Sequence, residues 1–437
     1  MALVRQRAAR RMAGCLALAA VAVATPSWAQ WGGLPAPALP TLPSGLTDRL
    51  PLTRDGLIPN SLDRLLQAPA RLDGLVRRSH GALQADPLGW PVVSGEIVAV
   101  DLSPEARARA LAAGYSVLRE EPLEALGLTA TVLAPPRRLS LSRAVDRLRE
   151  IAPDAEIAFN HVHSPAGMTG VGATGGPVAT GPQAINARLG LIDTGIDVTH
   201  PAFTASGVSQ RGFAGPARVG AHGTAVASLM VGRSGAFSGG APGQNILVAD
   251  IYGGDPAGGT STGLAQALAW MVEQRVTVVN VSLVGPRNAL VERAVAGAQA
   301  RGVTLVAAVG NDGPAAPPLY PASYEGVVGV TAVSARDRTL PEAARGPQVD
   351  FAAPGADMAA AGSAGSWTTV RGSSFAAPIV AGLLSRNGGG AGAVTALANS
   401  AADLGEPGRD PVYGAGLVGT GSRVAPAGMG ARGRLSR

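Results

Sequence analysis

The sequence contains no lysine, so all 36 of its basic residues are arginine. We interpret this absence as compositional bias, because no site chemistry calls for excluding lysine throughout a chain. Cysteine occurs once, at Cys15, and aromatic residues make up only 4% of the chain. The core must therefore be built from Val, Leu, Ile and Ala. With 437 residues, the chain is long enough for two or more domains.

The formal net charge is +6 and the pI about 10.3, values that suggest binding to nucleic acid. The positive excess, however, comes from the two ends of the chain. Residues 1–29 and 423–437 each carry four arginines and no acidic residue, and acidic residues slightly outnumber arginines between them. The rest of the chain therefore carries no excess of positive charge, and we expect no nucleic-acid partner.

Residues 1–29 are predicted to be a secretory signal peptide. Four arginines precede an apolar run over residues 13–24, and Ser27 and Ala29 offer small residues for cleavage. The run is too short to span a membrane, and we expect no transmembrane segment. A secreted or periplasmic protein is therefore expected. Because Cys15 lies inside the predicted signal, the exported chain cannot form a disulfide bond.

The next part of the sequence divides into a linker, a compact unit and a connection. Residues 30–92 are rich in Pro and Leu and are predicted to be a weakly ordered linker. Residues 93–164 show the order βαββαβ, which is typical of a small ferredoxin-like α+β domain. Residues 165–186 are rich in Gly and predicted to be a flexible connection. The expected strands are 96–100, 115–118, 128–133 and 155–159, and the expected helices follow Ser103 and Ser140.

Residues 187–421 alternate short apolar strands with helices, and residues 422–437 form a basic tail. Such alternation predicts an α/β domain with a doubly wound, mostly parallel sheet covered on both faces. Sites in these sheets gather at the carboxyl ends of the strands. The expected strands are 189–192, 245–251, 277–281, 303–308 and 327–333, and the expected helices are 264–274, 289–300 and the run after Ser374.

Four residues in this region are candidates for chemistry. Asp193, in LIDTGID, follows a strand and could orient an imidazole, although a turn Asp is the commoner interpretation. His222 lies in AHGTAVAS, at a Gly-Thr helix start. Asn311, in AAVGNDG, could donate to a developing oxyanion, although Asn-Asp-Gly equally suits a turn. Ser374, in RGSSFAAP, stands at the mouth of a buried helix as a nucleophile or as a simple N-cap.

These four segments, together with NVSL and DFAAPG, occur in the order found in subtilisin-like serine peptidases, and residues 187–421 resemble that family. The resemblance implies a serine endopeptidase that works through an acyl-enzyme. In it, Asp193 would orient His222, and His222 would deprotonate Ser374. Asn311 would hold the tetrahedral oxyanion together with the backbone N–H of Ser374.

The resemblance also implies where a substrate binds. Ser282, Leu283 and Val284 would pair with the substrate backbone as an added strand, and Tyr320 and Pro321 would flank the specificity pocket. Val284 stands where the family commonly has Gly, which indicates a narrower pocket that favours small side chains. No cofactor is expected. Residues 232–243 lack the Asn-rich calcium loop of many members, so a calcium requirement is in doubt and no clear metal site is expected.

By the same resemblance, residues 93–164 would be an inhibitory propeptide whose last strand enters the site. The chain would then be a self-processing zymogen, cut near His163 or soon after, with polypeptide substrates and its own propeptide as partners. Two alternatives remain open. The ferredoxin-like domain could stay permanently attached, since this fold serves many functions. The whole chain could also be a non-catalytic secreted binding or scaffold protein that retains the fold.

Overall fold

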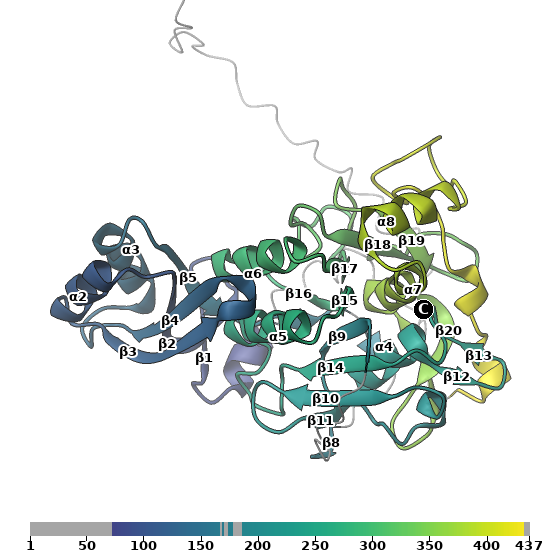
Figure 1. The fold of residues 1–437 in the computed structure, drawn as a ribbon, viewed down its shortest axis with the longest axis horizontal. Helices are drawn as coiled ribbons and strands as arrows, with labels where there is room; N and C mark the ends of the chain where they lie inside the picture. Colours follow the sequence, from purple (N-terminus) through teal and green to yellow (C-terminus); the bar gives the residue numbers. More distant parts are fainter. Residues whose placement is uncertain (1–71, 167, 170–173, 178–185, 432–437) are drawn as a thin grey trace, which may run out of the picture. The chain divides into compact units, whose positions relative to one another are not determined.

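The computed structural model describes residues 72–166, 168–169, 174–177 and 186–431 (Figure 1). All of them belong to one compact unit that comprises residues 57–437. The predicted signal peptide, most of the predicted linker, parts of the Gly-rich connection and the end of the basic tail lie outside the described residues.

The first described domain has the α+β order that the sequence predicts. Its antiparallel sheet runs β3–β4–β2–β5, which is the strand order of a ferredoxin-like fold. Ser103 caps the first helix, since its hydroxyl accepts the N–H of Ala106 at 3.2 Å. The elements are β2 (Pro91–Val100), α2 (Pro104–Ala112), β3 (Ser116–Leu123), the 3₁₀ turn η2 (Glu124–Leu126), β4 (Leu128–Ala134), α3 (Leu141–Ile151) and β5 (Glu156–His161).

This domain begins inside the stretch assigned to the linker. Residues 72–78 are helical, and β1 (Leu83–Ala85) pairs antiparallel with the start of β2. The turn between the two strands is closed by one side chain, because Oδ1 of Asp86 accepts the N–H groups of Leu88 and Trp90, both at 2.8 Å. Such an Asx-type turn is a local feature that a composition rich in Pro and Leu does not reveal.

The described parts of the Gly-rich connection are paired strands rather than free chain. Strand β6 (Ser164–Pro165) pairs with β16 (Leu283–Val284), and β7 (Met168–Thr169) pairs with β21 (Trp367–Arg371). A third piece, β8 (Thr174–Pro177), pairs with β11 (Arg218–Gly220). Each partner strand lies far away in the sequence, so composition alone could not predict this pairing.

A parallel seven-stranded sheet forms the centre of the second domain, in the order β10–β14–β9–β15–β17–β18–β19. The predicted α/β class is confirmed. The five central strands match the apolar runs read from the sequence, whereas the two edge strands, β10 and β19, had not been predicted. The strands are β9 (Leu189–Asp193), β10 (Val208–Gly212), β14 (Ile246–Asp250), β15 (Val278–Val281), β17 (Thr304–Ala308), β18 (Val328–Val333) and β19 (Phe351–Pro354).

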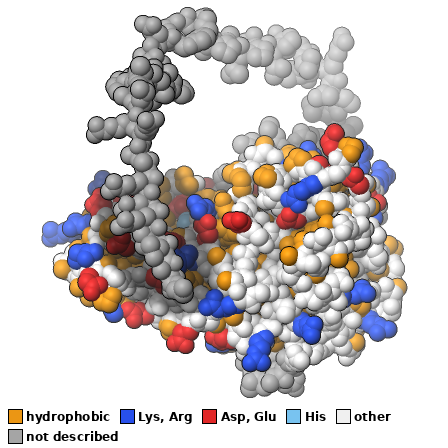
Figure 2. All heavy atoms as spheres, turned by 45° about the horizontal axis from the view of Figure 1, so that its top comes forward, with side chains coloured by type: hydrophobic (Ala, Val, Ile, Leu, Met, Phe, Trp, Pro, Cys, Tyr) orange, Lys and Arg blue, Asp and Glu red, His pale blue; other side chains and the backbone are white. Residues whose placement is uncertain are grey.

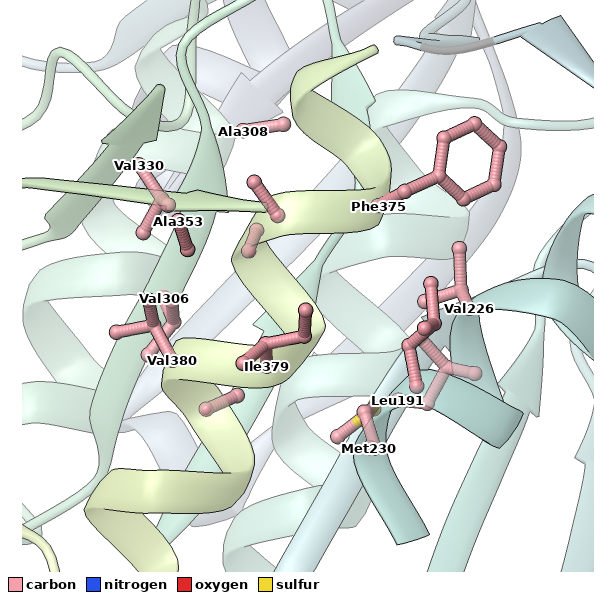
Figure 3. Packing of buried hydrophobic residues seen from close by; sticks show 14 of the residues in the cluster. Leu191, Val226, Met230, Val306, Ala308, Val330, Ala353, Phe375, Ile379 and Val380 are labelled. Carbon is pink, nitrogen blue, oxygen red and sulfur yellow. The ribbon is translucent and has the colours of Figure 1, made fainter. Parts of the chain in front are cut away.

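Alternate residues of these strands pack into two different cores. In β17, Val306 and Ala308 join the cluster that contains α4 (Ala221–Val231) and α7 (Ser373–Arg386). Their neighbours Leu305 and Ala307 join the cluster that contains α5 (Ser261–Glu273) and α6 (Ala289–Gln299). Helix α7 runs through the first core, where its residues face the side chains of the sheet and of α4 (Figure 3). The sheet is therefore covered on both faces.

The remaining elements complete the second domain, and part of the predicted basic tail belongs to it. The N–H of Ala359 donates to the carbonyl of Val424 at 2.8 Å, and Arg423 pairs with Asp337 at 2.6 Å. Arginine and acidic side chains are interspersed over the face shown in Figure 2. Of the helices in the described part of the chain, none has the length and apolar character needed to cross a bilayer. The elements not yet given are η3 (Pro201–Phe203), β12 (Arg233–Ser234), β13 (Phe237–Ser238), β20 (Ala356–Ala361), α8 (Gly390–Asn399), η4 (Thr420–Ser422) and η5 (Pro426–Met429).

Candidate active site

Asp193 and His222 form a buried pair. Asp193 is the last residue of β9, His222 is the second residue of α4, and Nδ1 of the imidazole lies 2.9 Å from both carboxylate oxygens. The two residues are 0% and 8% exposed. Because a carboxylate only accepts hydrogen bonds, Nδ1 carries the proton, and Nε2 is left as the basic atom of the ring.

The loop after β9 holds this pair in place. Oδ1 of Asp193 accepts the N–H of Thr194 at 2.7 Å, and the Thr194 hydroxyl accepts the N–H of Gly223 at 2.9 Å. A Cβ at Gly223 would lie 2.6 Å from that hydroxyl oxygen, so only glycine lets the helix start approach the strand end this closely. The Gly-Thr motif beside His222 therefore sets the distance between the two elements.

Ser374 lies at the start of α7, close to the imidazole. Gly372 caps the helix at φ 135°, a conformation that favours glycine. The ring of Phe375 packs against the ring of His222, with a centroid distance of 5.4 Å. The Ser374 hydroxyl donates to the carbonyl of Ser282 at 3.0 Å, and Nε2 of His222 is buried with no hydrogen-bond partner among the described residues.

Asn311 is tied to the same helix start. Its Oδ1 accepts the N–H of Ser373 at 3.0 Å, and the Ser373 hydroxyl accepts the N–H of Gly310 at 3.1 Å. Because Oδ1 already accepts a hydrogen bond, the amide nitrogen Nδ2 is oriented to donate to another acceptor. No hydrogen bond to Nδ2 is found within the part of the chain that the structure describes. The structure thus brings all four candidate residues of the sequence together at one edge of the sheet.

The predicted substrate edge already carries a segment of this chain. Leu283 and Val284 pair antiparallel with Pro165 and Ser164, and the N–H of Ala166 donates to the carbonyl of Ser282 at 3.2 Å. That carbonyl also accepts the Ser374 hydroxyl. Ala166 and Ser374 therefore approach the same backbone oxygen.

A second described segment, residues 168–169, pairs with the strand that precedes Ser374. Met168 pairs with Arg371 and Thr169 with Val370, both in the strand that leads into α7. Residues 164–165 and 168–169 are therefore each bound as an added strand, the first against β16 and the second against β21.

The space over Gly310 is bordered by Val284 and by Leu319, a residue without a motif of its own in the sequence. A Cβ at Gly310 would lie 2.6 Å from Cδ1 of Leu319 and 3.7 Å from Cγ1 of Val284, so both side chains border the space over Gly310. All three side chains, those of Ala166, Val284 and Leu319, are buried in one cluster. The only signal for Leu319 was its place directly before the Tyr320-Pro321 pair.

Tyr320 is bound to the residue that follows Val284. The backbone of Tyr320 exchanges two hydrogen bonds with Gly285, at 2.9 and 3.0 Å, and its peptide bond to Pro321 is cis. Tyr320 also packs on Tyr324, with ring centroids 4.5 Å apart. In the described part of the chain, no group of three or more His, Cys, Asp or Glu side chains is placed to hold a metal ion.

A buried carboxylate–imidazole pair, a serine at a helix start and an amide beside it lie at one edge of a doubly wound α/β sheet, an arrangement typical of serine hydrolases. The sequence profile of the subtilase family matches residues 185–416, which is more than half of the chain. The chain therefore belongs to the subtilase family, and by family it is a serine endopeptidase.

Three relatives illustrate the similarity. Thermitase of Thermoactinomyces vulgaris is 30% identical over 233 residues, which are 51% of this chain and 82% of that protein. The major intracellular serine protease of Bacillus subtilis (strain 168) is 28% identical over 221 residues, 47% of this chain and 69% of the relative. Subtilisin-like protease 1 of Trichophyton rubrum is 33% identical over 202 residues, 44% of this chain but only 39% of the relative.

Among solved structures, fervidolysin from Fervidobacterium pennivorans, described as a keratinolytic enzyme related to subtilisin, superposes with a TM-score of 0.61 at 18% identity. The superposition covers 79% of this chain and 62% of that one. At this identity the likeness shows a shared fold.

Proposed function

We propose that this chain cleaves peptide bonds with Ser374 as the nucleophile and His222 as the general base. Nε2 of His222 takes the Oγ proton while Oγ bonds to the substrate carbonyl carbon. The same proton then goes to the leaving amine as the C–N bond breaks, and a water molecule repeats the sequence to release the acyl group. Asp193 fixes the tautomer and stabilises the imidazolium. The 2.9 Å contacts of Nδ1 with both carboxylate oxygens are the observation that carries this proposal.

Asn311 and the N–H of Ser374 are assigned to the oxyanion. The Ser373 N–H binds Oδ1 of Asn311 and so fixes which end of the amide is free to donate. A donor that is oriented before the reaction costs no reorganisation when negative charge develops on the substrate oxygen.

Self-processing at the bond that follows Ala166 is part of the same proposal. Residues on both sides of that bond are paired with strands that flank Ser374, and Ala166 shares the Ser282 carbonyl with the nucleophile. The expected cut soon after His163 is thereby narrowed to one peptide bond. The processed N-terminal domain would then act as an inhibitor.

Contacts between the two domains support this inhibitory role. Arg293 of α6 pairs with Glu156 and with Asp101, both at 3.1 Å. The side chain of Asn288 donates to the carbonyl of Phe159 at 2.9 Å. Leucines of η2 and β4 share a buried cluster with α5 and α6. None of these contacts depends on the bond after Ala166, so they remain once it is cut.

The site also supports a preference for a small side chain before the cleaved bond. Val284 and Leu319 border the space over Gly310, within the buried cluster that holds Ala166. A larger side chain would have to displace one of the two, at a cost typical of overpacking, about 1–3 kcal/mol.

Export remains a proposal that rests on residues 1–29 of the sequence. It predicts that the mature N-terminus produced in cells lies beyond Ala29, which N-terminal sequencing of precursor trapped by Ser374→Ala would test. An N-terminus at Met1 would contradict it.

Labelling with a fluorophosphonate tests the proposed activity against the rival hypothesis of a non-catalytic binding protein. We expect covalent label on the processed wild type and none on Ser374→Ala. Ser385→Ala is the matched control, since Ser385 lies on the same helix and bonds Gln244 instead. Absence of label on processed wild type would overturn the proposal.

A further inference from the structure

Arg371 and Glu342 form an ion pair beside the proposed nucleophile. Nε and Nη2 of Arg371 donate to the two carboxylate oxygens of Glu342 at 2.6 and 2.9 Å. The two side chains are only 21% and 7% exposed. Arg371 ends β21 and is followed by Gly372, which caps the helix that carries Ser374. A two-pronged pair fixes orientation as well as distance, so Glu342 is held in one place relative to the start of α7.

The segment that carries Glu342 is bonded to both ends of the loop that holds Asn311. The N–H of Gly313 donates to the carbonyl of Glu342 at 2.9 Å, and the N–H of Ala344 donates to the carbonyl of Gly310 at 3.1 Å. Gly310 and Gly313 both have φ 101°, a conformation that favours glycine. Asn311 thus lies on a short loop between two glycines, and the Glu342 segment holds each end of that loop.

This segment is itself seated in the core of the domain. Leu340, Ala343 and Ala344 are each 1% exposed. Leu340 and Ala343 pack in the core that contains α4 and α7, and Ala344 packs in the core that contains α5 and α6. The N–H of Leu340 also donates to the carbonyl of Ala332 in β18 at 3.1 Å. Glu342 therefore projects from a fixed base, to which the Asn311 loop is bonded.

The Asn311 loop also meets the helix start directly, at Ser373. The Ser373 N–H donates to Oδ1 of Asn311 at 3.0 Å, and the Ser373 hydroxyl accepts the N–H of Gly310 at 3.1 Å. A single contact residue defines a point about which the loop can tilt. The Arg371–Glu342 pair adds a second point of attachment two residues earlier, and two points together fix the direction in which Nδ2 of Asn311 donates.

We infer that Glu342 and Arg371 are positioning residues, whose ion pair aligns Nδ2 of Asn311 with the oxyanion that forms when Ser374 attacks. This inference rests on the proposed function. The pair acts through Asn311 and not through its own charge, and these two explanations predict opposite signs. Glu342→Gln removes a negative charge beside the site and would raise kcat if charge alone mattered, whereas a loosened loop lowers kcat.

The experiment measures kcat and KM of the processed enzyme on a peptide anilide with Ala before the cleaved bond. The variants are Glu342→Gln and Glu342→Gln combined with Arg371→Met, each made with Asn311 intact and again with Asn311→Leu. The combined variant leaves no unpaired buried charge, so it preserves the fold best. Glu292→Gln is the matched control, because Glu292 of α6 forms an exposed two-pronged pair with Arg287, with both contacts at 2.9 Å.

With Asn311 intact, both variants should lower kcat about tenfold, a part of the roughly 10²- to 10³-fold that an oxyanion donor supplies, with KM changed less than about twofold. In the Asn311→Leu background the same changes should lower kcat by no more than about twofold, because the group that they align is gone. Glu292→Gln should leave kcat unchanged in both backgrounds. Thermal unfolding of each variant verifies that the enzyme measured is folded.

A rise of kcat in Glu342→Gln would overturn the inference, because it would show that the charge itself acts on the reaction. An equal loss of kcat with and without Asn311, a loss carried by KM, or no change in the combined variant would overturn it as well. If processed wild type hydrolyses no peptide and takes no fluorophosphonate, the proposed function itself has failed, and that result is distinct because it needs no variant.

Discussion

The carbonyl of Ser282 accepts the hydroxyl of Ser374 at 3.0 Å. The same oxygen accepts the N–H of Ala166, the last described residue of the segment bound along the substrate edge. The proposed nucleophile and the residue before the bond proposed for cleavage therefore both bind a single backbone oxygen. For attack, the hydroxyl must exchange this carbonyl for Nε2 of His222, which has no other partner among the described residues.

Ser374→Ala should block maturation if processing is autocatalytic. The variant keeps the substrate strand in place but has no oxygen to attack the carbonyl carbon. Intact-mass measurement should show a precursor still joined across residues 166 and 167, whereas wild type and Ser385→Ala should show the cut. A Ser374→Ala chain trimmed at that bond would point to another protease.

Asn311→Leu should lower kcat about 10²- to 10³-fold, roughly 3–4 kcal/mol of transition-state stabilisation, with little change in KM. The amide acts only on charge that develops during the reaction. Because Oδ1 also binds the N–H of Ser373, Asn311→Asp is a useful second variant that keeps this acceptor, removes the donor and adds a negative charge beside the oxyanion. If Asn311→Asp retained wild-type kcat, the oxyanion assignment would be wrong.

The sequence could predict those candidate residues that stand beside a recognisable strand end or helix start. Asp193 follows an apolar strand, and His222 and Ser374 each stand where a glycine precedes or opens a helix. Central strands such as β15 were visible as apolar runs because both of their faces are buried. The edge strand β10 was missed, since its sequence, VSQRG, is mostly polar and only partly buried.

Residues whose role depends on distant parts of the chain could not be found in this way. Leu319 matters because it borders the same space as Val284, from another loop. Tyr252, in the loop between β14 and α5, donates to the carbonyl of His163, which directly precedes the strand β6 bound to β16. Neither residue carries a local motif, and both contacts arise only when separate segments are brought together by the fold.

Val284→Gly should widen acceptance of large residues before the cleaved bond, and Val284→Gly combined with Leu319→Gly should widen it further. The two side chains border the same space, so their effects are expected to be coupled rather than additive. Profiling a peptide library should show the ratio of kcat/KM for Phe over Ala rising about tenfold or more in the double variant. If the double variant kept the wild-type preference for small residues before the cleaved bond, the assignment of Val284 and Leu319 to the specificity pocket would be wrong.

Inhibition by the processed N-terminal domain should weaken as the pH falls. Burial lowers the pKa of His163 from 6.5 to about 4, aided by the nearby charge of His161. A ring whose pKa is depressed in the complex must stay neutral, so binding is fully favoured above pH 6.5. It is lost progressively between pH 6.5 and 4, by up to roughly tenfold per pH unit and about 300-fold in all.

His163→Phe isolates this effect, because phenylalanine keeps a planar ring beside Gly285 but cannot be protonated. The dissociation constant of the processed complex, measured from pH 4 to 8, should vary steeply for wild type and much less for the variant. Any slope left in His163→Phe would come from other ionisable groups of the complex. Identical profiles for wild type and His163→Phe would show that the buried imidazole does not control release.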